Sequence, residues 1–76
     1  MVKINWDEYK VYKQVSNKDD NFEILLDFIK SYYNMIGVFD IYDILMSDEL
    51  AKMMLQKREI EDAQDLENYI YKANNG

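Results

Sequence analysis

The sequence contains no cysteine, no histidine and no proline, and only two of its 76 residues are glycine. Without cysteine the chain forms no disulfide, and without cysteine or histidine it lacks the usual ligands of zinc and iron sites. Stability must therefore come from side-chain packing in a core of marginal size, or from association with another chain.

Sequence motifs of enzymes and of cofactor sites are also missing. Gly37 and Gly76 cannot form a glycine-rich phosphate loop, and none of the serines lies in a nucleophile motif. The acidic stretch at 17–28, NKDDNFEILLDF, lacks the turn glycine and the ligand spacing of an EF-hand. We therefore expect a protein that is not an enzyme and that binds no metal or other cofactor.

Basic residues are the minority among the charges, with nine Lys and Arg against fifteen Asp and Glu and a net charge of −6. Such a surface repels phosphate backbones and anionic lipid headgroups. The chain also shows no apolar run of membrane-spanning length and no signal-peptide pattern. We therefore expect a cytoplasmic protein that binds neither nucleic acid nor membrane directly, and whose partner is a basic protein.

What the chain does have is a high apolar content, 49%, with seven Tyr, three Phe and one Trp. This composition is too apolar for a disordered chain, and no linker or repeat divides it. We expect residues 1–76 to form a single acidic helical domain.

Capping patterns predict the first two helices. Asn5 followed by Glu8 is a capping box, so a helix is expected over about 6–15, although apolar alternation over residues 2–6 leaves a strand as the alternative. Asp20 begins the second helix, and Gly37 supplies its left-handed stop. Its apolar face comprises Phe22, Leu25, Leu26, Ile29, Tyr32, Tyr33 and Ile36. So wide a face indicates the central helix of the domain, or one that buries a side against a partner.

The second half of the chain predicts two or three further helices. In the stretch VFDIYDILM, residues 38–46, Asp40 is the expected cap of a helix, and Ser47 either caps a separate helix or kinks a continuous one. The last helix begins near Asp62. Its inward residues are Ala63, Leu66, Tyr69, Ile70 and Ala73. The expected fold is an all-α bundle of four short helices, or five if Ser47 divides two.

An apolar stripe of methionines marks the expected helix after Ser47. It consists of Met46, Leu50, Met53 and Met54. We interpret it as core filling, with a flexible binding groove as the alternative.

The stretch REIEDAQDLENYI, residues 58–70, concentrates five carboxylates. Asp62 and Asp65 suit the start of a helix, and Lys57 and Arg58 can each pair with an acid four residues on. The remaining acids form either an ordinary solvated face or, with the two tyrosines beside them, a surface that meets a basic groove. The predicted partner-binding residues here are Glu59, Glu61, Asp62, Asp65, Glu67, Tyr69 and Tyr71.

A second acidic and aromatic patch lies in FDIYDILMSDE, residues 39–49. Its acids suit helix caps and first turns, or they extend the same negative surface. As second-choice partner-binding residues we predict Asp40, Tyr42 and Asp43.

These features favour an interaction module that binds and inhibits a basic, nucleic-acid-handling enzyme by placing carboxylates where phosphates bind. In size, acidity and lack of catalytic groups the chain resembles phage inhibitors of host defence nucleases, including anti-CRISPR proteins, which act in the host cytoplasm. The alternatives are a homo-oligomeric structural or regulatory module, which the wide apolar helix favours, and an antitoxin or adaptor.

Overall fold

The computed structural model describes residues 3–34 and 37–75. Over these residues the backbone forms helices and no strand. The helices are α1 (Trp6–Val15), α2 (Asn21–Tyr32), α3 (Val38–Met46), α4 (Glu49–Lys57) and α5 (Ala63–Asn75). The all-α prediction is confirmed with five helices in this part of the chain, because Ser47 separates α3 from α4. None of the described helices is long and apolar enough to cross a membrane.

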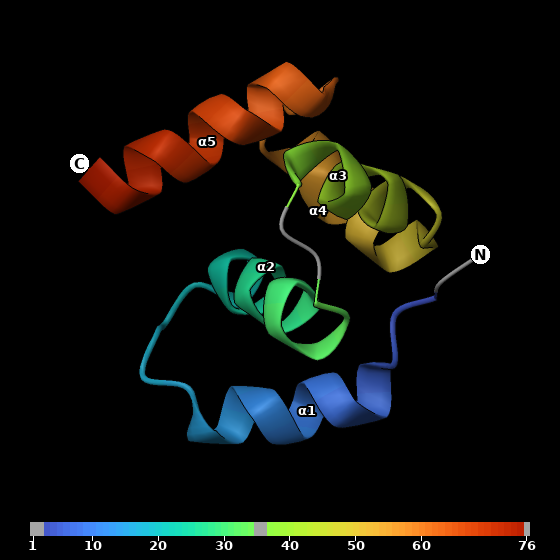
Figure 1. The fold of residues 1–76 in the computed structure, drawn as a ribbon, viewed down its shortest axis with the longest axis vertical. Coiled ribbons are helices and arrows are strands. Elements are labelled where there is room, and N and C mark those ends of the chain that lie inside the picture. The colour runs from blue at the N-terminus through green and yellow to red at the C-terminus, as the bar shows by residue number, and fades with distance from the viewer. Residues whose placement is uncertain (1–2, 35–36, 76) are drawn as a thin grey trace.

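Helix α2 lies at the centre of the fold (Figure 1). It packs against α1 on one side and contacts α3 on the other, and α3 in turn packs against α4 and α5. Six side chains of α2 are buried: Phe22, Ile24, Leu25, Leu26, Phe28 and Ile29. The chain itself therefore covers most of the wide apolar face, as expected of a central helix, but Tyr32, assigned to that face, is 49% exposed. Ile36, assigned to the same face, lies outside the described residues.

The first helix forms as its capping pattern predicts. The side chain of Asn5 accepts a hydrogen bond from the backbone N–H of Glu8 at 3.2 Å. Tyr9 on the inner face of α1 is buried, and its hydroxyl donates to the carbonyl of Asn21 at 3.1 Å. Because helical capping and burial agree, the helix forms over the residues expected and the strand alternative is wrong.

The predicted boundary between α2 and α3 is wrong at both ends. Helix α2 ends at Tyr32, and the left-handed residue that follows is Asn34, with φ 55°. Asparagine tolerates this conformation better than most residues, so the helix stops before it reaches Gly37. Gly37 instead has φ −93° and is the N-cap of α3, while Asp40 lies in the first turn of α3 rather than at its cap.

The cap of α4 is Asp48 and not Ser47. Ser47 ends α3, and its hydroxyl donates to the carbonyl of Asp43 at 2.8 Å. Asp48 accepts the backbone N–H of Ala51 at 3.1 Å through Oδ1, and the Trp6 indole N–H at 2.9 Å through Oδ2. One carboxylate thus caps α4 through one oxygen and ties α1 to it through the other.

The core-filling interpretation of the methionine stripe is wrong for most of its members. Ala51 and Leu55 occupy the core side of α4, so Leu50 and Met53 are 59% and 52% exposed. Met46 is also exposed, and only Met54 packs partly against the core.

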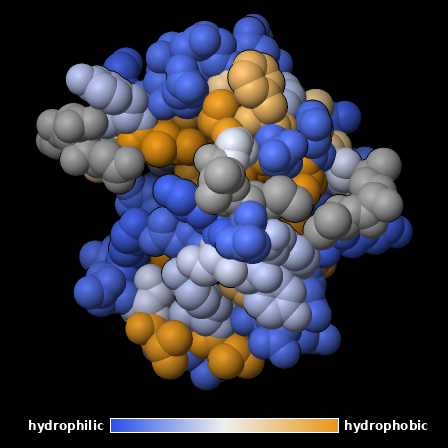
Figure 2. Space-filling model, viewed as in Figure 1, coloured by the Kyte–Doolittle hydropathy of each residue, from blue (hydrophilic) through white to orange (hydrophobic). Residues whose placement is uncertain are grey.

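The surface differs between the two ends of the molecule. Apolar side chains gather at the end over α1, whereas hydrophilic ones cover much of the end over α5 (Figure 2).

Candidate functional site

The acidic stretch begins where α4 ends, in a tight C-terminal turn. The N–H of Ile60 donates to the carbonyl of Leu55 at 3.0 Å, and the N–H of Glu59 donates to that of Gln56 at 3.1 Å. This pair of bonds defines a Schellman motif, which needs a left-handed residue after the C-cap and usually places glycine there. Here Glu59 occupies that position, with φ 58°. The turn directs the exposed Glu59 away from the core, in a conformation that costs of order 1 kcal/mol for a residue with a Cβ.

This turn also overrides the local ion pairs expected of Lys57 and Arg58. Because α4 ends at Lys57, neither cation lies one helical turn before an acid. Arg58 turns instead to Asp20, with a guanidinium nitrogen 3.2 Å from its Oδ1. The predicted pairing of Lys57 and Arg58 with Glu61 and Asp62 is therefore wrong.

Two of the predicted binding acids organise the start of α5. Asp62 accepts the N–H of Asp65 at 2.8 Å, and Asp65 in turn accepts the N–H of Glu61 at 3.0 Å. The first bond satisfies an N–H group that the first turn of a helix leaves free, and the second joins the residue before the cap to that turn. Asp62 is the helix cap that the sequence predicts, and both carboxylates already have structural partners.

Tyr42 brings the second acidic patch beside the first. Its hydroxyl donates to the backbone carbonyl of Glu61 at 2.8 Å, which joins α3 to the α4–α5 loop. Between these elements lies an open hollow of about 390 Å³. The side chains that line it are Tyr42, Met46, Lys52, Leu55, Gln56, Glu59, Ile60 and Glu61. Three predicted binding residues, Tyr42, Glu59 and Glu61, thus surround one concave site.

The outward side of α3 continues this surface. Because Ile41, Ile44 and Leu45 face the core, the residues on the opposite side of the helix point to solvent. Phe39 lies there and is 71% exposed. Sequence reasoning missed Phe39, although its position opposite Ile41 on the helix is the signal that identifies it. We name as the α3 face the residues Phe39, Asp40, Tyr42, Asp43, Met46, Glu59 and Glu61.

The carboxylates of the α3 face have no cationic partner within the described part of the chain. Ion pairs there join only Lys18 to Asp27 and Arg58 to Asp20. Asp40, Asp43, Glu59 and Glu61 are all exposed, and no group of acids in the described residues is arranged to hold a metal ion. The face therefore combines uncompensated negative charge with exposed aromatic and thioether surface.

Tyr69 lies elsewhere, in a polar cluster that joins α2, α4 and α5. Its hydroxyl donates to Oδ2 of Asp20 at 3.1 Å, and its ring meets that of Phe22 edge to face at 5.3 Å. The Arg58 guanidinium lies 4.5 Å from the centre of the Phe22 ring. Burial, offset only in part by this guanidinium, raises the pKa of Tyr69. Tyr69 is thus placed to hold the fold together, whereas Tyr71 on α5 is largely exposed.

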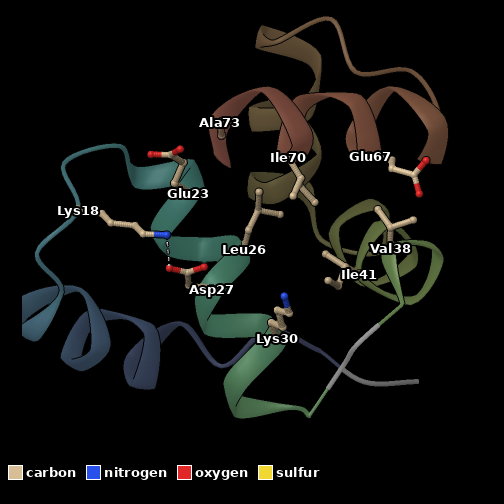
Figure 3. A pocket seen from close by; sticks show the side chains of 10 residues that line it. All are labelled: Lys18, Glu23, Leu26, Asp27, Lys30, Val38, Ile41, Glu67, Ile70 and Ala73. Carbon is tan, nitrogen blue, oxygen red and sulfur yellow. Dashed lines mark ion pairs between the residues drawn. The ribbon is translucent and has the colours of Figure 1, made fainter. Parts of the chain in front are cut away.

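Glu67 borders a different cavity, between α2, α3 and α5 (Figure 3). This cavity measures about 270 Å³ and has Leu26, Ile41 and Ile70 among its apolar lining. Charges of both signs surround it, and Lys18 closes one side through its ion pair with Asp27 at 2.6 Å. The single acidic ridge predicted for 59–67 is thereby divided: Glu59 and Glu61 join the α3 face, and Glu67 does not line the same hollow.

No protein-family model matches this chain, and neither the curated proteins nor the solved structures yield a match. The function is therefore inferred from the α3 face and its chemistry.

Proposed function

We propose that this chain is a small acidic interaction module that binds a basic, nucleic-acid-handling protein and blocks it. The observation that supports this proposal is the α3 face, where four exposed acidic residues without cationic partners accompany the apolar side chains of Phe39, Tyr42 and Met46. Glu59 and Glu61 lie beside Tyr42, whereas Asp40 lies about 160° from Tyr42 around the helix. A protein groove that binds phosphates presents Lys and Arg at its surface, and this face has the complementary charge.

The two kinds of side chain have different tasks in this proposal. The carboxylates attract the basic partner from a distance and set its orientation, mainly through the association rate. Phe39 and Tyr42 supply apolar contact area, as aromatic residues do at the centres of protein interfaces. Inhibition results because the bound module occupies the place of the nucleic acid; the module itself carries out no reaction.

The proposed setting is the cytoplasm, or the host cytoplasm if a phage encodes the chain. The class of inhibitor that best fits is the one that phages direct against host defence nucleases, anti-CRISPR proteins among them. An antitoxin or adaptor would use the same face on another basic partner, so the identity of the captured protein separates these functions.

Affinity capture from a bacterial lysate tests the proposal with two variants of equal net charge. One carries D40N, D43N, E59Q and E61Q on the α3 face. The matched control carries D7N, E8Q, D19N and E49Q, four exposed acids elsewhere. We expect the wild type and the control to capture a nucleic-acid enzyme and reduce its activity, and the α3-face variant to lose both effects. Equal capture and inhibition by both variants would contradict the proposal.

A further inference from the structure

The hollow beside α3 has walls of distinct chemistry. Leu55 and Ile60 are buried beneath it, and the ring of Tyr42 and the thioether of Met46 form the α3 side. Glu59 and Glu61 bring two carboxylates from the α4–α5 loop. An apolar interior with acidic groups at one edge fits a guest that is apolar along its length and positively charged at its end.

Among protein side chains, arginine and lysine have this shape. Arginine fits better for two physical reasons. Its guanidinium is less strongly hydrated than an ammonium, and its planar fork both stacks on an aromatic ring and binds carboxylates through paired N–H groups. Tyr42 offers the ring, and Glu59 and Glu61 offer the carboxylates.

Lys52 lines the α4 side of the same hollow. Within the described residues it forms no ion pair with either acid, and its positive charge together with the two negative ones gives the lining a net charge of −1. One guest cation neutralises that charge, whereas a second would meet repulsion from Lys52 and from the first. The hollow is therefore suited to one cationic side chain.

The conformation of Glu59 is consistent with such a role. Glycine would relieve the left-handed strain of the Schellman turn, yet the chain has a carboxylate there at the edge of the hollow. We propose that this hollow receives one arginine side chain of the basic partner. The inference rests on the proposed function, since it names the group by which the partner is recognised.

Titration of the isotopically labelled protein with three short capped peptides tests the inference by NMR. The peptides are Ac-Gly-Arg-Gly-NH₂, its lysine counterpart and its citrulline counterpart, which has nearly the shape of arginine but no charge. We expect the arginine peptide at millimolar concentration and low salt to shift the amide signals of Tyr42 and of residues 59–61. The lysine peptide should bind more weakly and the citrulline peptide should leave these signals unchanged.

Single-residue variants locate the binding. E59Q and E61Q should each weaken binding of the arginine peptide by roughly two- to fivefold, the usual range for one exposed charge pair. E67Q removes an acid that does not line the hollow and should leave the affinity unchanged. Shifts confined to other parts of the protein, equal shifts by the citrulline peptide, or unchanged affinity in both E59Q and E61Q would overturn the inference.

The two proposals fail in different ways. If the arginine peptide binds in the hollow but the α3-face variant still captures and inhibits the enzyme, the proposed function is wrong and the hollow remains an arginine site. If capture depends on the α3 face while the arginine peptide leaves the hollow unshifted, only the arginine inference is wrong.

Discussion

At the scale of single residues, the side chain of Glu59 lowers the stability of the fold but carries a carboxylate that the proposed binding uses. Its φ of 58° is costly for any residue with a Cβ, and glycine avoids that cost. Glycine also loses more conformational entropy on folding, which takes back part of the gain. We expect E59G to raise the free energy of unfolding by about 0.5–1 kcal/mol, measured by urea denaturation.

The control for E59G is E59A, which removes the same carboxylate but keeps a Cβ in the left-handed conformation. We expect no comparable stabilisation from E59A. Both variants should weaken binding of the arginine peptide, so E59G would be more stable and bind less well. Equal stability of E59G and E59A would mean that the backbone strain at this turn is negligible.

Asp20 is the residue whose protonation is most directly linked to folding. Burial alone would raise its pKa, but hydrogen bonds from the Phe22 N–H and the Tyr69 hydroxyl, together with the Arg58 guanidinium, outweigh burial and lower it. A carboxylate whose pKa is lowered by folding stabilises the fold at pH values above the pKa of the unfolded chain, about 3.9 for Asp. This contribution is lost as the pH falls through the pKa of the folded protein.

The substitution D20N tests this linkage. Asparagine keeps a capping oxygen for α2 but loses the charge that faces Arg58. We expect D20N to be less stable than the wild type at about pH 6, and the difference to shrink towards about pH 3, because the stabilisation by the Asp20 carboxylate decreases as the pH falls below the unfolded pKa towards the lowered folded pKa. Urea denaturation of both proteins at the two pH values measures it. A difference that is the same at both values would show that the charge of Asp20 contributes nothing.

At the scale of elements, the start of α4 depends on one carboxylate. Asp48 caps the helix and also binds the Trp6 indole of α1. We expect D48A to cost about 1–2 kcal/mol, because it removes a cap and leaves the indole N–H without its acceptor. Thermal unfolding followed by the fluorescence of Trp6, the single tryptophan of the chain, reports both effects.

Two further variants distinguish the contribution of the Asp48 cap from that of the adjacent Ser47. D48N keeps a good capping side chain and should lose less stability than D48A. S47A removes an exposed hydroxyl whose bond lies within the end of α3, and it should change stability by less than about 0.5 kcal/mol. If S47A proved as harmful as D48A, Ser47 rather than Asp48 would be the group that α4 needs.

Comparison of the predicted with the observed N-caps shows which helix starts can be predicted from the sequence. Asn5, Asp20 and Asp62 are correctly predicted caps: Asn5 and Asp20 are each followed three residues on by a glutamate, and Asp62 directly precedes the apolar pattern of α5. Where Ser47 and Asp48 are adjacent, both are good caps and local propensity does not choose between them. The choice depends on Trp6, 42 residues away, whose indole needs an acceptor at that place.

The candidate site was predictable to a similar extent. The acidic character of residues 59–67 is plain in the sequence, but their division into separate surfaces is not, because it depends on the turn at Glu59 and the bond from Tyr42 to Glu61. Tyr69 illustrates the limit most clearly. The inward position of Tyr69 on its helix is predicted correctly, but its partner Asp20 lies 49 residues away, so the sequence does not show that its hydroxyl joins two helices.

At the scale of the whole molecule, the burial of α2 decides how the homo-oligomeric alternative must be tested. That alternative gained its support from the wide apolar face of α2, which this chain covers with its own helices. The apolar surface that remains exposed lies mainly on other helices, including Leu50 and Met53 on α4. A homo-oligomer would have to use such residues instead.

We therefore expect sedimentation at micromolar concentration to give the mass of a monomer, 9.2 kDa. Leu50 and Met53 line one hollow with Trp6, Met54 and Lys57, but exposed apolar residues in this number are normal on the surface of globular proteins. The charge variants L50K and M53K should leave the mass unchanged, and so should the α3-face variant. A dimer that L50K or M53K dissociates would contradict this expectation and would favour the homo-oligomeric module. A monomer in every case would exclude the homo-oligomeric module at this concentration and would agree with the proposal that the chain acts on a different protein.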